Sequence, residues 1–190
     1  MLIKRWLFLL LGIGLVLATS VTATPVIASA NSIFPPILTQ LVTQTKVPIF
    51  LPSFVPQEDY PLYATVTSVT PTEYEVVIGD RQNCNGGNYC RYGAVIGKKL
   101  SSSTPSIEHE YAFMKDPRYK PTERSSDLMG QIRLKNGLNA YFVPYICGAS
   151  CDDAKVVWNY NGYRYLVGLK RSDKKTVVDM ANSMVQVDGV

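Results

Sequence analysis

The sequence predicts an α+β protein, with a mostly antiparallel curved sheet built from hairpins and a C-terminal helix packed on one face. Three observations support this class. Apolar and polar residues alternate over several runs within residues 62–169, as half-buried antiparallel strands require. Asn-Gly pairs at 136–137 and 161–162 indicate hairpin turns. Apolar residues at helical spacing then follow at 177–185.

The N-terminus has the layout of a bacterial secretory signal peptide. Lys4 and Arg5 precede a compact apolar run, residues 6–18, and small residues follow up to Ala30. This order predicts cleavage after Ala30, with Ala23 as a second option. The alternative is a membrane anchor, but a spanning helix needs about 20 consecutive apolar residues and this run is shorter. We therefore expect a secreted or periplasmic protein.

We predict three regions along the chain: the signal peptide at 1–30, a short helix and proline-rich segment at 31–60, and an antiparallel β domain with a C-terminal helix at 61–190. Residues 1–30 contain two basic and no acidic side chains, so the remainder carries 17 basic and 15 acidic ones, a formal net charge of +2. Such a balance lacks the basic surface that drives nucleic-acid binding. We expect a monomer that binds neither nucleic acid nor a cofactor.

The first elements can be placed from prolines and alternation. An N-terminal proline and one apolar side predict a short helix at 35–44. The segment 47–56 is apolar but contains three prolines, which cannot donate to a strand ladder, so it forms at best an edge strand. Alternation predicts a strand from Leu62, a second near Glu73 after a Thr-Pro-Thr turn, and a third at 91–99.

A polar segment with several prolines lies between residues 98 and 130. Loops of this length are uncommon in compact domains and are often functional or mobile. The sequence EHEYAFM, residues 108–114, suggests a short strand inside it. Residues 111–124 mix aromatic and basic side chains, which suggests contact with an anionic surface such as a cell-wall polymer or lipid headgroups. The alternative is an ordinary solvated face.

The last hairpin can be placed in register from its turn. Asn161 and Gly162 tolerate the positive φ angles of a type I′ turn, so the residues on either side pair in order. One face then contains Val156, Trp158, Tyr160, Tyr163, Tyr165 and Val167. We interpret the aromatic residues as core beneath the C-terminal helix. The alternative is a ligand-binding platform formed by Trp158, Tyr160, Tyr163 and Tyr165.

Residues 172–187 supply the helix that covers this face. Ser172 is suited to the N-cap, and Asp173 to the first turn. The apolar positions that recur at helical spacing are Val177, Val178, Ala181, Met184 and Val185.

The four cysteines predict two local disulfides. Cys84 ends the strand that begins near Glu73 and Cys90 opens the next strand, so this pair flanks a hairpin loop. Cys147 and Cys151 bracket three small residues between two strands. We predict the pairs Cys84–Cys90 and Cys147–Cys151, although the sequence also permits the other two pairings.

Metal binding and redox chemistry are the alternatives for these cysteines. The first pair has five intervening residues, whereas structural zinc motifs have two to four, and an exported protein meets an oxidising environment. Neither pair has the Cys-x-x-Cys spacing of thiol oxidoreductases. Structural disulfides are the prediction, with no metal site.

Few residues suggest catalysis. His109 is the only histidine, and no nucleophile motif accompanies it. Asp152 and Asp153 are adjacent in the sequence, which is a poor arrangement for flanking a glycosidic bond and favours a solvated turn. Residues 83–90 match no phosphate-binding glycine motif. We predict no catalytic residue, and an envelope hydrolase using His109 or a carboxylate pair is the alternative function.

The ending of the chain, residues 156–185, is a Trp and Tyr hairpin followed by a helix with Ala181 and Ser183. It resembles the ending of bacterial exported domains of unknown function and is loosely similar to lipoprotein-carrier-like proteins. The resemblance implies an antiparallel sheet wrapped on a helix with an apolar cavity. We expect an exported, non-enzymatic binding or envelope-associated protein whose partner is an envelope lipid or a cell-wall polymer.

Overall fold

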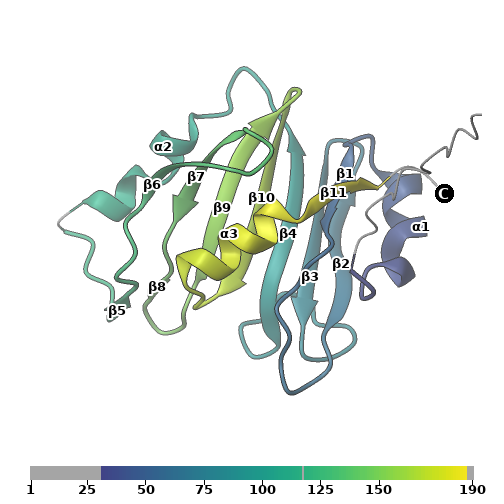
Figure 1. Cartoon of the computed structure of the whole chain (residues 1–190), viewed down its shortest axis with the longest axis horizontal. Helices are drawn as coiled ribbons and strands as arrows, with labels where there is room; N and C mark the ends of the chain where they lie inside the picture. Colours follow the sequence, from purple (N-terminus) through teal and green to yellow (C-terminus); the bar gives the residue numbers. More distant parts are fainter. Residues whose placement is uncertain (1–30, 117, 188–190) are drawn as a thin grey trace, which may run out of the picture.

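The computed structural model of the chain describes residues 31–116 and 118–187 (Figure 1). The predicted signal peptide lies outside the described residues. Among the helices of the described part, none is long and apolar enough to cross a membrane.

A seven-stranded antiparallel sheet forms the centre of the fold, with the strand order β2-β3-β4-β10-β9-β7-β6. Its strands are β2 (Tyr63–Thr70), β3 (Glu73–Gly79), β4 (Arg91–Lys99), β6 (Gly130–Arg133), β7 (Asn139–Val143), β9 (Asp153–Tyr160) and β10 (Tyr163–Lys170). The sheet is not closed, so β2 and β6 are its edges. The predicted α+β class with a mostly antiparallel sheet is confirmed.

Within residues 31–116 and 118–187, two short ladders and four helical segments surround the sheet. In one ladder β1 (Ile49–Pro52) pairs with β11 (Met184–Val187), and in the other β5 (Glu123–Arg124) pairs with β8 (Ile146–Cys147). The helical segments are α1 (Pro35–Gln44), α2 (Ile107–Glu110), the 3-10 helix η1 (Ala112–Lys115) and α3 (Lys174–Asn182). The helix predicted at 35–44 is confirmed, and the proline-rich segment forms a strand outside the main sheet.

The main core lies on the face that packs against α3, α1 and the β1-β11 ladder. Val177 and Met180 of α3 are fully buried in the same cluster as residues of β9 and β10. Hydroxyl groups fix β1 over the sheet, because Tyr74 exchanges two 3.1 Å hydrogen bonds with the backbone of Phe50. The Tyr165 hydroxyl donates to the carbonyl oxygen of Pro48 at 3.1 Å. Segments far apart in the sequence are thereby joined.

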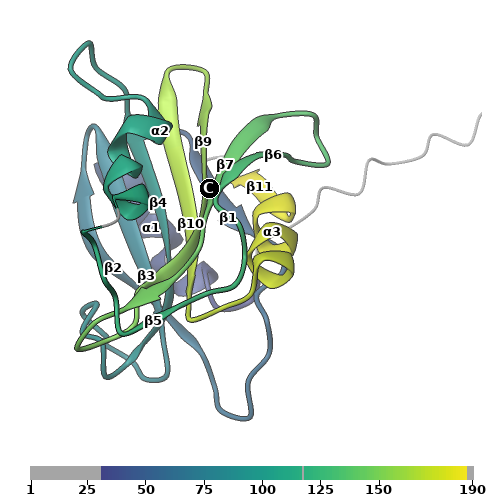
Figure 2. The same ribbon diagram turned by 90° about the vertical axis from the view of Figure 1, so that its left-hand side faces the viewer.

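The opposite face is covered by α2 and η1, which Figure 2 shows on the other side of the sheet from α3. Tyr111 and Met114 from this segment are buried against Tyr141, Val143 and Val157 of β7 and β9. The strand predicted at 108–114 is therefore wrong. Tyr111 and Met114 are three positions apart, so in a helical turn both side chains lie on the side that packs against the sheet.

The C-terminal hairpin has the predicted register, with Trp158 opposite Tyr165 and a turn in which Asn161 and Gly162 have φ values of 49° and 82°. The helix after it differs in detail. Asp173, not Ser172, is the N-cap, and its carboxylate accepts a 2.9 Å hydrogen bond from the Thr176 N–H. Met184 and Val185 leave the helix and belong to β11, because β1 offers them a partner strand.

The first Asn-Gly pair does not form a two-residue turn. Leu134 and Leu138 close the loop with a 2.9 Å backbone bond from N–H to carbonyl oxygen, so three residues lie between them. Gly137 has a positive φ of 83°, and Asn136 does not. A three-residue loop of this kind needs only one residue in the left-handed region.

Candidate functional site

Both predicted disulfides are present, Cys84–Cys90 and Cys147–Cys151. Cys84 and Cys90 are 1% and 2% exposed and pack on Val77 of β3. Gly79 makes room for them, since a Cβ there would lie 2.5 Å from the Cβ of Cys84. The first disulfide is thus part of the packing on the sheet. β3 ends at Gly79, so the prediction that Cys84 ends this strand is wrong, and the bond closes the loop between β3 and β4.

The two disulfide loops meet although they are far apart in the sequence. The Asn88 side-chain amide donates to the hydroxyl of Ser150 at 2.9 Å. Lys170, at the end of β10, donates through Nζ to the carbonyl oxygen of Asn88. One end of the sheet therefore carries two short covalently closed loops in contact with each other.

A pocket of about 670 Å³ opens beside these loops, and we call it the disulfide-end pocket. Asn88, Tyr89 and Cys90 line it from the first loop, and Ser150 and Cys151 from the second. The remaining lining residues come from the segment after β1 and from the strand ends: Glu58, Tyr60, Asp80, Arg91, Tyr92, Lys170 and Arg171.

One lining residue, Arg91, belongs to a buried ion pair. Arg91 of β4 pairs with Asp153 of β9, whose side chain is 3% exposed. Burial raises the pKa of Asp153, and the Arg91 guanidinium opposes that rise. Among the described residues, Arg91 Nε is the one buried side-chain nitrogen or oxygen without a hydrogen-bond partner. The solvated turn predicted for Asp152 and Asp153 is wrong for Asp153, which points into the protein.

Further charges at the pocket are paired along its rim. Arg171 contacts Glu123 with its closest approach at 2.9 Å, and Arg81 contacts Asp80 at 2.7 Å. The hydrogen bond from Arg81 holds the pKa of the Asp80 carboxyl below its usual range. The rim therefore presents both hydrogen-bond donors and acceptors.

Exposed tyrosine rings complete the pocket. Tyr89 is 72% exposed, with the Arg81 guanidinium 5.4 Å from its ring centroid, and Tyr60 is 45% exposed. Tyr92 is half-buried, and its pKa is raised by burial and by the nearby Glu58 carboxylate. No sequence pattern marked these tyrosines, because they come from separate segments.

The aromatic residues of the last hairpin are mainly core. Trp158 and Tyr165 are 3% and 0% exposed, and their rings stack with centroids 5.7 Å apart. Phe50 of β1 covers Tyr165 edge-on at 5.0 Å. Tyr160 is 37% exposed and Tyr163 is partly buried. The two central rings of the predicted platform are thus closed off by β1.

The residues considered for catalysis are not brought together. His109 is exposed on α2, and its backbone N–H donates to the Ser106 hydroxyl that caps the helix. Asp152 is exposed and pairs with Lys155 at 3.0 Å, whereas Asp153 is buried against Arg91. The two adjacent carboxylates therefore face different surroundings.

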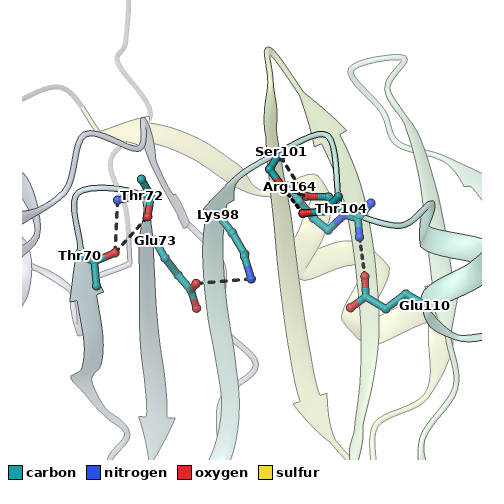
Figure 3. A network of polar contacts seen from close by, with 9 residues as sticks. Thr70, Thr72, Glu73, Lys98, Ser101, Thr104, Glu110 and Arg164 are labelled. Atoms are coloured by element: carbon teal, nitrogen blue, oxygen red, sulfur yellow. Dashed lines mark hydrogen bonds and ion pairs between the residues drawn. The ribbon is translucent and has the colours of Figure 1, made fainter.

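A second polar cluster, at the other end of the sheet, positions α2 (Figure 3). Arg164 of β10 is 9% exposed and donates to Glu110 at 2.5 Å, to the Pro105 carbonyl at 2.7 Å and to Asn159 at 3.0 Å. All three partners of Arg164 belong to the protein itself, so this cluster holds the α2 segment on the sheet.

The mixed aromatic and basic segment is only partly exposed. Tyr111 is buried, whereas Phe113 and Tyr119 are 50% and 40% exposed and lie edge-on at 5.5 Å. Arg118 is engaged by Asp116 at 2.5 Å. The anionic-surface interpretation stays a prediction.

One group of side chains has metal-ligand spacing: Glu123, Cys147 and Cys151 place one donor atom each within 4.8 Å of one another. Both sulfurs are bonded to each other, so neither offers a thiolate. Glu123 accepts from Arg171 and from the Tyr145 hydroxyl. These donors are committed within the protein, and the group does not fit a zinc site.

Comparison of the chain with protein-family models, with curated proteins and with solved structures gives no match. The function proposed below therefore depends on the geometry of the site.

Proposed function

We propose that the protein is an exported, disulfide-bonded, non-enzymatic binding protein and that its ligand site is the disulfide-end pocket. The observation that carries this proposal is the pocket of about 670 Å³ beside the contact between the two disulfide loops. Ligand sites are concave, largely preformed and provided with a few convergent polar groups.

Rigidity is the first supporting argument. Both loops that line the pocket are closed by disulfides, and the Asn88–Ser150 hydrogen bond links one to the other. Loops fixed before binding lose little conformational freedom when a ligand arrives, so more of the interaction energy is realised as affinity. The two disulfides at one end of the sheet provide this preorganisation.

The lining favours a polar ligand. Lys170 and Arg171 supply donors, and Glu58 and Asp80 supply acceptors, around the pocket. Tyr60 and Tyr89 add exposed ring faces with a polar hydroxyl at the tip. Burying an apolar acyl chain here would remove charged groups from water without compensation. A cell-wall polymer or another polar chain suits the lining better than the apolar part of a lipid.

Native mass spectrometry of protein purified from the secreted or periplasmic fraction tests the proposal. We expect a mature chain that starts at Asn31 with both disulfides intact. We also expect an additional mass from a bound compound that dissociates when the ion is activated by collisions. Tyr89→Ser should lose the compound, since this ring is 72% exposed in the pocket and carries little of the fold. Leu128→Ser is the matched control, because Leu128 is 83% exposed and does not line the pocket. An identical compound load in Tyr89→Ser, or none in the wild type, contradicts the proposal.

A further inference from the structure

Two further hollows are linked to the disulfide-end pocket through shared lining residues. A hollow of about 270 Å³ shares Glu58 and Tyr60 with it. A third, of about 550 Å³, shares Ser32, Ile33 and Leu62 with the second. The second hollow follows the segment between β1 and β2, and the third follows the start of β2, so the series suits an elongated ligand.

The third hollow follows the edge of the main sheet. Its lining includes the five consecutive residues 62–66, at the start of β2. Successive residues of a strand point to opposite faces, so a hollow that touches all five lies along the strand edge and not on one face. The other wall is α1, through Pro36, Ile37 and Gln40. Figure 1 shows α1 beside β2 at this margin of the sheet.

The edge of β2 offers unpaired backbone groups to this groove. β2 pairs with β3 on one side only. Among the described residues, no backbone hydrogen bond outside the β2-β3 ladder involves residues 62–66. Backbone N–H and C=O groups have a strong requirement for partners, and an open edge presents them at the spacing of another strand. The register shift between Val66 and Ser68 ends the regular stretch.

We propose that this groove binds an extended polypeptide segment of a partner protein, which adds to β2 as a further strand and reaches the disulfide-end pocket past Tyr60. This inference rests on the proposed function and names the chemical class of its ligand. Only a polypeptide presents alternating donors and acceptors with the repeat that the edge of β2 offers. A saccharide or an acyl chain lacks that repeat.

The walls define the partner segment further. None of the residues that line the third hollow carries a charged side chain. Ile33, Ile37 and Leu62 make the walls apolar near α1. The segment bound there carries uncharged, mainly apolar side chains, and the five residues 62–66, of which the last four belong to β2, span about 17 Å. Charged or polar side chains of the segment then lie at the disulfide-end pocket.

Panning of a phage-displayed random dodecapeptide library on the processed, oxidised protein tests the inference. Enriched peptides are synthesised, and their affinities are measured by fluorescence anisotropy. N-methylation of single amides along a peptide should weaken binding about tenfold at every second position and leave the intervening positions unchanged. This period of two reports strand addition without altering the protein.

Two variants on one helix locate the peptide. Gln40→Trp places a large ring in the groove and should weaken binding about tenfold or more. Gln44→Trp is the matched control, because Gln44 is also exposed on α1, one turn further on, and does not line the groove. Far-ultraviolet circular dichroism and the unfolding midpoint of both variants establish that they fold.

The possible outcomes separate this inference from the proposed function. No enriched peptide, an N-methylation profile without a period of two, or equal binding by Gln40→Trp and Gln44→Trp overturns strand addition. Native mass spectrometry that finds a Tyr89-dependent saccharide or small molecule in the purified protein also overturns it, while the proposed function stands. If no peptide is enriched and no Tyr89-dependent compound is found, the inference and the proposed function are both contradicted.

Discussion

Asp153 at the start of β9 reaches across β10 to form a buried ion pair with Arg91 of β4. The carboxylate passes over Gly168 of β10, where a Cβ would lie 2.9 Å from Asp153 Oδ2. The pair links β9 to β4 across β10, and its Arg91 is one of the residues that line the disulfide-end pocket. Its stability therefore bears on both the fold and the candidate site.

Replacement of Asp153 should cost more than most surface changes. Asp153→Ala leaves the Arg91 guanidinium, whose side chain is 23% exposed, without its carboxylate, and removal of one partner of a buried pair costs about 3 kcal/mol or more. Asp153→Asn should cost less, because its amide oxygen still accepts from Arg91. Urea denaturation at neutral pH measures both. Equal stabilities for Asp153→Ala and the wild type would show that the pair contributes nothing.

Gly97 is required by the packing of Tyr74. The two residues face each other across β3 and β4, and a Cβ at position 97 would lie 2.3 Å from the tyrosine ring. Tyr74 is fully buried and bonded to Phe50, so the ring cannot move away freely. Gly97→Ala should therefore lower the free energy of unfolding by about 1–3 kcal/mol. Gly130→Ala is the control, since no atom lies within 4 Å of its added Cβ, and it should change stability by less than about 0.5 kcal/mol.

Loss of the first disulfide should destabilise the protein through both the unfolded and the folded state. Closing a loop this short is worth about 2 kcal/mol in the chain-entropy model. Cys84 and Cys90 also pack on Val77, so the double variant Cys84→Ser/Cys90→Ser buries two hydroxyl groups in an apolar site. The double alanine variant avoids that second cost and should be the more stable of the two. Guanidinium denaturation of both under non-reducing conditions checks the order.

Local patterns in the sequence predicted the local features of the fold. The helix at 35–44, the register of the last hairpin and both disulfides depend on residues close in the chain, where spacing and turn chemistry decide the geometry. The strand expected at 108–114 failed because isolated apolar residues fit a strand or a helical turn equally well. What decided between them is contact with β7 and β9, which no local pattern contains.

Features that join distant segments were not predictable in this way. Met184 and Val185 continue the helical spacing of α3, yet they pair with β1 in the β1-β11 ladder. Pairing with a distant strand therefore outweighs the helical pattern of the local sequence. The Arg91–Asp153 pair depends on the order β4-β10-β9. The disulfide-end pocket likewise draws its lining from segments that meet only in the folded chain. Its tyrosines carry no spacing that would mark them as a group.

Asp173 at the start of α3 should make the stability depend on pH. Hydrogen bonds from the backbone N–H and the hydroxyl of Thr176 hold the pKa of Asp173 below its ordinary value of 3.8. Because the folded-state pKa is the lower one, the stabilisation is present above that ordinary value and is lost as the pH falls through the folded-state pKa. Asp173→Ala should cost about 1 kcal/mol at neutral pH.

The difference in stability between Asp173→Ala and the wild type should shrink as the pH is lowered below 3.8, the ordinary pKa of an aspartate. Thermal unfolding followed from neutral to strongly acidic pH measures it. Asp173→Asn serves as the control. Its amide oxygen caps the helix at every pH, so the difference in stability between Asp173→Asn and Asp173→Ala should not change with pH. A gap between Asp173→Ala and the wild type that does not change with pH would contradict the capping role of the ionised carboxylate.

Arg164 should decide whether the α2 segment stays on the sheet. Its three hydrogen bonds, to Glu110, Pro105 and Asn159, connect β10 with the segment and with β9. Figure 3 shows the bond to Glu110. Arg164→Ala removes all three, and the segment is then held mainly by its apolar contacts and by an exposed 3.3 Å hydrogen bond from Gln131 to Glu108. Local opening becomes more frequent while the sheet stays folded, because segments with few remaining contacts open at low cost.

Trypsin reports this opening at Lys115, an exposed residue within the segment. We expect cleavage after Lys115 to accelerate several-fold in Arg164→Ala, with little change in the midpoint of global unfolding. Lys175→Ala is the control, because the Lys175 side chain is 87% exposed on α3 and its loss should alter neither quantity. If Arg164→Ala lowers the unfolding midpoint without faster cleavage after Lys115, the cluster supports the sheet itself and other contacts hold α2.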